Sequence, residues 1–148
     1  LNLAAGRKVG ANYLLNVGPK ASGEIPAYEA ATLRRVGEWI RLHGDLIYKG
    51  KPAPIAGMGD DFALEYDGRV YLFIHHLSVH GDSHVVSMAS GAGPRSFMGV
   101  KTKVAKVRWL DNDEELDFAQ DVNSGMLTIN ATGYPYGTNL VVRVAELT

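Results

Sequence analysis

The sequence contains no cysteine, and this absence excludes disulfide bridges, thiolate nucleophiles and thiolate metal ligands together. It also contains no run of about 18 apolar residues, so no segment is predicted to cross a membrane. Neither sign of charge is in excess: 15 basic and 16 acidic side chains leave a formal net charge of −1. No overall field therefore favours nucleic acid or a polyanion, and we expect any partner to be uncharged.

The first residues lack every feature of a chain start. Residues 1–5 (LNLAA) have no initiator methionine, no basic stretch and no cleavage-site pattern, which is typical of mid-chain sequence. We therefore expect a fragment, a processed product or the second polypeptide of a split protein, and the cellular compartment stays open. The 148 residues, 46% of them apolar, predict a buried core.

The first third of the chain predicts one buried strand followed by one amphipathic helix. The apolar residues 13–17, closed by Gly18 and Pro19, are typical of a strand buried on both faces in a parallel sheet. Residues 27–43 follow Pro26 with apolar side chains at spacings of three and four, which predicts a helix that ends at Gly44. One βα unit cannot bury its own faces, so its neighbours must come from other sequence.

The rest of the chain predicts antiparallel β structure. Residues 49–59 are rich in glycine and proline, which indicates a linker. Asp67-Gly68 then predicts a hairpin between residues 62–66 and 69–76. Further strand-like runs are residues 84–88, 104–110, 115–119, 126–130 and 140–145. Short strands separated by turns are typical of an antiparallel sandwich.

Four histidines have a spacing that would suit a metal site on a helix: His75, His76, His80 and His84. The local pattern is a strand followed by a loop, and neighbouring strand residues point to opposite faces of the sheet. We expect surface histidines in a hairpin, and we predict no metal site and no cofactor.

Carboxylates are plentiful, but none is well placed for paired acid–base chemistry. Those considered are Glu24, Glu29, Glu38, Asp111, Asp113, Glu114 and Glu115. The first three flank or occupy the solvated side of the predicted helix, and the others form an acidic turn expected to face solvent. We therefore predict no catalytic residue in this chain.

Aromatic residues leave an alternative function open. Trp109, Tyr134 and Tyr136 could stack on sugar rings if turns expose them, although core packing is the usual role of a strand tryptophan. The alternative hypothesis is a non-catalytic β-sandwich that binds carbohydrate or docks a partner.

Four motifs occur in one order over residues 12–48: residues 12–19 (NYLLNVGP), 23–26 (GEIP), 33–40 (LRRVGEWI) and 44–48 (GDLIY). This series resembles the α-L-fucosidases of glycoside hydrolase family 29, which carry N-x-L-L-N-x-G-P, G-x-I-P, L-x-x-x-G-x-W and N-G-E-x-I-Y. The family implies a catalytic (β/α)8-like barrel, a β-sandwich after it, and retaining cleavage of α-L-fucosides through a covalent intermediate. Ser22, His43 and Asp45 depart from the family pattern, which bears on substrate detail rather than on membership.

The resemblance implies a fold class and three parts: an α/β fragment (1–48) that is the final βα unit of the barrel, a linker (49–59), and an all-β antiparallel sandwich (60–148). The family's aspartate nucleophile and its acid/base, usually a glutamate, precede the first motif. The chain alone is therefore expected to be inactive, and to need the upstream barrel polypeptide as a partner and a fucosylated glycan as substrate.

The resemblance also places two residues near the sugar. The C-terminal end of a barrel strand faces the active site, which would bring Asn16 and Lys20 to the vicinity of the substrate. Asn16 is expected to bond loop backbone rather than the sugar itself. Nucleic acid and membrane partners are not expected, and the oligomeric state is left open, a homo-oligomer included.

Overall fold

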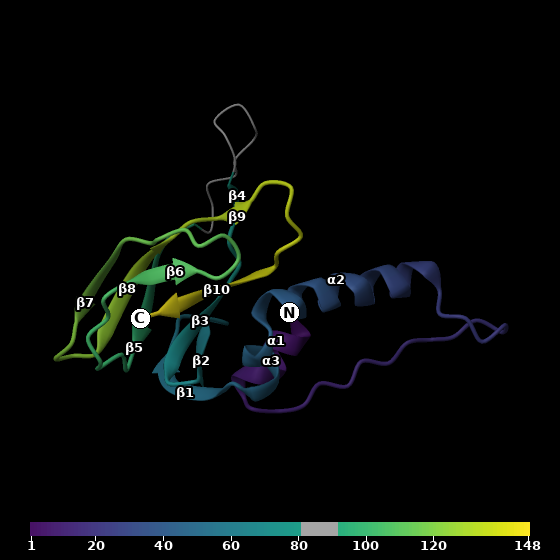
Figure 1. Ribbon diagram of the computed structural model, residues 1–148, viewed down its shortest axis with the longest axis horizontal. Coiled ribbons are helices and arrows are strands. Elements are labelled where there is room, and N and C mark those ends of the chain that lie inside the picture. Colours follow the sequence, from purple (N-terminus) through teal and green to yellow (C-terminus); the bar gives the residue numbers. More distant parts are fainter. Residues whose placement is uncertain (81–91) are drawn as a thin grey trace.

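The computed structural model describes residues 1–80 and 92–148, with helices at the start of the chain and strands after them (Figure 1). The helices are α1 (Asn2–Lys8), α2 (Ala27–His43) and α3 (Asp45–Lys49). The strands are β1 (Lys51–Ala56), β2 (Phe62–Tyr66), β3 (Arg69–His75), β4 (Val79–His80), β5 (Gly93–Met98), β6 (Val107–Trp109), β7 (Phe118–Asp121), β8 (Met126–Ala131), β9 (Tyr134–Pro135) and β10 (Val142–Leu147). None of the helices so described is long and apolar enough to cross a membrane.

Helix α2 confirms the helix predicted for residues 27–43. Pro26 is its N-cap rather than its first helical residue, with φ −54° and ψ 142°. At the other end Gly44 adopts φ 51°, a conformation that favours glycine, and its N–H bonds to the carbonyl of Ile40. Arg41 and His43 lie in the last turn, near the negative end of the helix dipole.

The strands form one antiparallel sheet in the order β6-β10-β3-β2-β1-β5-β8-β7, beside a small β4-β9 pair. Strands β2 and β3 form the predicted hairpin, and its two turn residues have positive φ, 50° at Asp67 and 73° at Gly68. A type I′ turn requires this geometry. Strands β1 and β5 join through one pair, Ala56 with Met98, and the sheet bends there.

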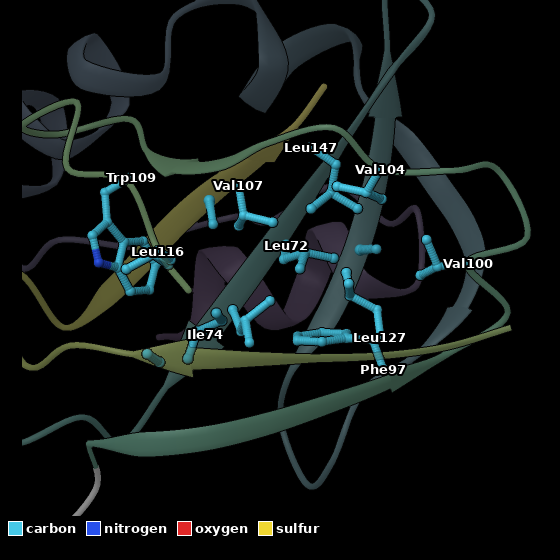
Figure 2. Packing of buried hydrophobic residues seen from close by; sticks show 14 of the residues in the cluster. Leu72, Ile74, Phe97, Val100, Val104, Val107, Trp109, Leu116, Leu127 and Leu147 are labelled. Atoms are coloured by element: carbon cyan, nitrogen blue, oxygen red, sulfur yellow. The ribbon is translucent and has the colours of Figure 1, made fainter. Parts of the chain in front are cut away.

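The two halves of the bent sheet enclose the larger core. Leu72 and Ile74 of β3 meet Phe97 of β5 and Leu127 of β8 in one apolar interior (Figure 2). Val107, Trp109 and Leu147 fill the same space from β6 and β10. An antiparallel β domain is therefore confirmed, but it is one nearly closed, barrel-like sheet rather than two separate sheets.

The outer face of the sheet packs against the helices. Its apolar side chains are Phe62, Leu64, Tyr71, Phe73, Val142 and Val144. They contact Ala4 of α1, Trp39 and Ile40 of α2, and Leu46 and Ile47 of α3. Because β3 is covered on both faces, residues 71–75 are all buried.

Several sequence predictions differ from the structure. No strand forms at residues 12–19, because none of the described strands lies beside this segment to pair with it. The predicted linker contains β1, and α1 and β5 were not predicted. The predicted strand at residues 84–88, with His84, lies outside the described residues.

Candidate functional site

The NYLLNVGP segment (residues 12–19) connects α1 to α2 as an extended, unpaired chain (Figure 1). Its two leucines are exposed, Leu14 to 83% and Leu15 to 44%, while Val17 is half-buried. Apolar side chains in a run are normally buried, so this exposure is unusual for such a sequence.

The segment is tied to the start of α2 by polar contacts. The Gly18 N–H donates to Glu29 Oε2 at 3.1 Å. Beyond it, the Lys20 N–H donates to the carbonyl of Glu24 at 2.8 Å, and the Lys20 ammonium lies 3.5 Å from the Glu24 carboxylate. These bonds close the loop that leads into the helix.

The two residues predicted near the substrate, Asn16 and Lys20, are both exposed. They lie four positions apart in the NYLLNVGP segment and the loop after it, and neither contacts the β domain through a hydrogen bond among the described residues. Their position at the pocket mouth stays a prediction.

Helix α2 presents two different faces. Trp39, Ile40 and His43 face the sheet, and the indole N–H of Trp39 donates to the carbonyl of Val142 at 2.9 Å. The face bearing Ala30, Leu33 and Gly37 contributes to neither core cluster of the described residues. These three residues are spaced by three and four, so they share one side of the helix.

Hydrogen bonds hold α1 to the β domain as well. The Arg7 guanidinium donates to the carbonyl of Gly50, and the Lys8 ammonium donates to the carbonyl of Gly59 at 3.0 Å. At Gly50 a Cβ would lie 2.5 Å from the carbonyl oxygen of Leu46, so this close approach requires glycine. The ends of the NYLLNVGP segment are thus fixed while its middle is uncovered.

His43 is the last residue of α2, and its side chain is buried without a hydrogen-bond partner on either ring nitrogen. Its ring meets the Trp39 ring edge-on at 4.6 Å between centroids. Burial lowers the pKa of His43 to about 4, because the charged imidazolium would lose its hydration. The histidine is therefore neutral at neutral pH.

Every carboxylate considered from the sequence has a polar partner. Exposed pairs join Lys20 to Glu24, Arg35 to Glu38, Arg108 to Asp113 and Lys106 to Glu115, while Glu29 accepts from Gly18 and Glu114 accepts from Asn112. The prediction that the whole acidic turn faces solvent is wrong at Asp111, whose side chain is buried. Its two oxygens each lie 3.0 Å from a nitrogen of Arg143, whose side chain is completely buried.

Arg143 and Glu146 were not recognised as buried charges from the sequence. Arg143 also donates to the carbonyl of Gly133 at 2.7 Å, and Glu146 accepts from Arg69 and Arg108. Burial would raise the pKa of Glu146, but the hydrogen bonds from Arg69 and Arg108 outweigh it and hold the pKa below the usual value. A charged residue inside the apolar run 140–147 is the signal that could have revealed both.

The histidines do not converge. The His75 ring is buried with Nδ1 3.4 Å from Asp61 Oδ1, while the exposed His76 ring bonds Asp60 at 2.7 Å. The residues that the structure describes contain no group of three or more side chains able to hold a metal ion. His80 belongs to β4, and His84 lies outside the described residues.

The proposed aromatic platform is wrong for Trp109. Its side chain is 0% exposed, its indole N–H donates to Thr132 Oγ1 at 2.8 Å, and the Arg143 guanidinium lies 4.1 Å from its ring centre. The Tyr134 hydroxyl donates to the carbonyl of Val141 at 2.6 Å. Tyr136 is 67% exposed, so these three residues form no shared stacking surface.

Comparison with known proteins connects the NYLLNVGP segment and the β domain to one family. Residues 4–45 match the family Alpha-L-fucosidase. Tissue alpha-L-fucosidase of Rattus norvegicus is 32% identical over 133 residues, which are 88% of this chain and 26% of the rat protein. The alpha-L-fucosidase of Dictyostelium discoideum is 34% identical over 77 residues, 49% of this chain and 16% of that protein.

Solved structures share the fold over almost the whole chain. Alpha-L-fucosidase isoenzyme 1 from Paenibacillus thiaminolyticus has a TM-score of 0.70 and 27% identity, with 99% of this chain and 32% of that chain covered. The Thermotoga maritima alpha-fucosidase gives 0.67 with 22% identity, 99% of this chain and 33% of that chain, and at this identity it shows the fold alone.

The relatives define the class, which is that of the glycoside hydrolases. The chain belongs to the α-L-fucosidases of glycoside hydrolase family 29 and corresponds to the C-terminal part of such an enzyme. It spans about a quarter of the length of the mammalian relatives, 26% of the rat protein and 25% of the mouse protein.

Proposed function

We propose that the chain supplies the last barrel strand, the closing helix and the C-terminal β domain of a retaining α-L-fucosidase. The complete enzyme would hydrolyse terminal α-L-fucosyl residues of glycans. The aspartate nucleophile and the acid/base would belong to the upstream barrel, so the 148-residue chain alone is inactive. Its partner is that upstream polypeptide.

The exposure of the NYLLNVGP segment carries this proposal. Leu14 and Leu15 lie in a sequence typical of a buried parallel strand, yet Leu14 is 83% exposed. A parallel strand needs a neighbour on each edge, and a closed barrel supplies both. The side of α2 that bears Leu33 and Gly37 is only partly buried and belongs to neither core cluster of the described residues, so the upstream barrel would complete its packing.

The proposal gives Asn16 and Lys20 their positions. Once the segment pairs with its neighbours, both residues follow the apolar stretch toward the C-terminal end of the strand, where barrel enzymes hold their substrates. The exposed Lys20 ammonium, 3.5 Å from the Glu24 carboxylate, would also donate a hydrogen bond to an uncharged sugar, and the Asn16 amide would bond the loop backbone.

An assay with an aryl α-L-fucoside tests the proposal. We expect no turnover by the isolated chain and turnover after co-expression with the upstream polypeptide. Strong turnover by the isolated chain would refute the claim that the catalytic carboxylates lie elsewhere.

A pair of variants separates docking from folding. Leu14→Asp should leave the isolated chain as stable as before, because the side chain is exposed, yet abolish turnover in the assembled enzyme. Val122→Asp places the same charge on an exposed valine in the turn between β7 and β8, and it should leave both properties unchanged. Full turnover by Leu14→Asp would contradict a buried barrel strand.

A further inference from the structure

A cleft lies between the second half of α2 and two loops of the β domain, residues 111–112 and 135–140, and we call it the α2 cleft. Its volume is about 280 Å³. In Figure 1 the loop from β9 to β10 passes on one side of α2, while the NYLLNVGP segment runs on the other side. The cleft therefore does not occupy the side of α2 where that segment runs.

The base of the α2 cleft is apolar and contains a fixed aromatic ring. Trp39, Leu42 and Pro135 line it. The bond from the Trp39 indole N–H to the carbonyl of Val142 holds the ring in place. The rings of His43 and Phe73 contact Trp39 edge-on, at interplanar angles of 72° and 61°. Trp39 is only partly buried, and the part of its side chain that lines the cleft offers apolar surface to one face of a pyranose ring.

The rim of the α2 cleft carries unused hydrogen-bonding groups. Among the described residues, the Asn139 amide makes no side-chain hydrogen bond. Glu38 uses Oε2 to accept from Arg35 at 3.0 Å, which leaves Oε1 as an acceptor. The Thr138 hydroxyl donates to the carbonyl of Pro135 at 2.7 Å and keeps its lone pairs. Donors and acceptors thus surround the apolar base, as in sites that orient a small polar ligand.

The charges at the α2 cleft cancel in pairs. Arg35 pairs with Glu38, and Asp111 pairs with Arg143 through two 3.0 Å bonds. The buried Arg143 also bonds Asn112 Oδ1 at 3.2 Å, so the far wall is held in place from inside the domain. A wall fixed before binding loses little entropy on binding. With no unpaired charge, the site favours a neutral ligand over a phosphate or a carboxylate.

We propose that the α2 cleft binds one neutral pyranose unit of a glycan, with the ring stacked on Trp39 and its hydroxyls bonded to Asn139 and Glu38. The volume suits a single sugar ring rather than a long chain, because larger ligands fill clefts of several hundred Å³. This site needs only residues of this chain, so it stands apart from the proposed hydrolysis of fucosides.

The two tryptophans of the chain provide the readout. We would titrate the full 148-residue chain with L-fucose, D-galactose or N-acetyl-D-glucosamine and follow the two indole N–H signals by nuclear magnetic resonance. At least one sugar should shift the Trp39 signal in a saturable manner. The Trp109 signal should stay in place, because that ring is completely buried.

Two asparagine variants test whether the polar rim of the α2 cleft contributes to sugar binding. Asn139→Ala should weaken the binding about fivefold, the effect of one lost hydrogen bond. Asn123→Ala removes the same amide from the exposed turn between β7 and β8 and should leave the affinity unchanged. The proposal is overturned if no sugar shifts the Trp39 signal, or if Asn139→Ala binds as tightly as the unaltered chain.

The fucosidase assay keeps this inference separate from the proposed function. Turnover by the assembled enzyme without a sugar-dependent Trp39 shift would remove the cleft proposal alone. A saturable Trp39 shift in a chain that never supports turnover would retain the cleft and remove the enzyme proposal.

Discussion

The β domain and the NYLLNVGP segment bury their apolar side chains in opposite ways. Leu72 of β3 is 0% exposed between two packed layers, whereas Leu14 is 83% exposed in an unpaired chain. Both lie in sequences that predict buried strands. The difference teaches that the β domain finds its partners within these 148 residues, while the segment pairs with none of the described strands.

The largest expected effect comes from the same substitution at these two leucines. Leu72→Ala should lower the free energy of unfolding by about 4 kcal/mol, because it removes buried surface and leaves a cavity. Leu14→Ala should change it by less than about 0.5 kcal/mol. Urea denaturation followed by circular dichroism measures both. Comparable losses would show that the segment is already packed in this chain.

Two arginines extend the comparison to charge. Arg143→Met should cost about 3 kcal/mol, because it leaves Asp111 without its buried partner. Arg35→Met breaks only the exposed pair with Glu38 and should cost less than about 1 kcal/mol. The same urea experiment applies. If Arg35→Met lowered the free energy of unfolding as much as Arg143→Met, the Arg35 side chain would also stabilise the chain through packing.

His43 makes the contact between α2 and the sheet sensitive to acid. The unfolded chain takes up a proton near pH 6.5, but the folded chain resists it until about pH 4. The free energy of unfolding should therefore fall as pH drops between these values, by about 3 kcal/mol in total. Above pH 6.5 the stabilisation is fully present.

The variant His43→Leu isolates this effect, because it removes the titrating ring and keeps an apolar side chain of similar size. Carboxylates whose pKa values are lowered, such as those of Asp45 and Glu146, also cost stability in acid, and they do so in both proteins. The difference between the two stability curves should thus grow from pH 6.5 to pH 4. Parallel curves would show that His43 is hydrated in the folded chain.

Local chemistry explains which elements could be predicted from the sequence. The hairpin follows from Asp67-Gly68, whose positive φ angles few other dipeptides adopt, and α2 follows from its periodicity and from Gly44. Strand β1 was hidden by Pro52 and Pro54, which weaken a strand pattern. They are tolerated because the register of β1 against β2 is irregular between Pro52 and Ala56.

The buried polar network could not be predicted, because its members come from distant parts of the chain. Arg143 of β10 meets Trp109 and Asp111 at the end of β6, more than 30 positions earlier in the chain, and only the folded sheet brings the two segments together. The opposite holds for the candidate site, whose residues are neighbours in the sequence. Residues 12–19 were recognised from the motif they form, yet the predicted strand does not appear, because none of the described strands pairs with them.

The smallest expected effects come from alanine at two glycines, and they differ in sign. Gly50→Ala should cost about 2 kcal/mol, since its Cβ would lie 2.5 Å from the Leu46 carbonyl oxygen where α3 meets β1. Gly37→Ala should stabilise the chain by up to about 1 kcal/mol. The added Cβ would meet no atom within 4 Å outside the neighbouring backbone of α2, and alanine favours the helix interior. Thermal unfolding of both variants measures the contrast. A loss of stability for Gly37→Ala would mean that the space beside Gly37 is already filled in the isolated chain, so this side of α2 would no longer support docking against a barrel.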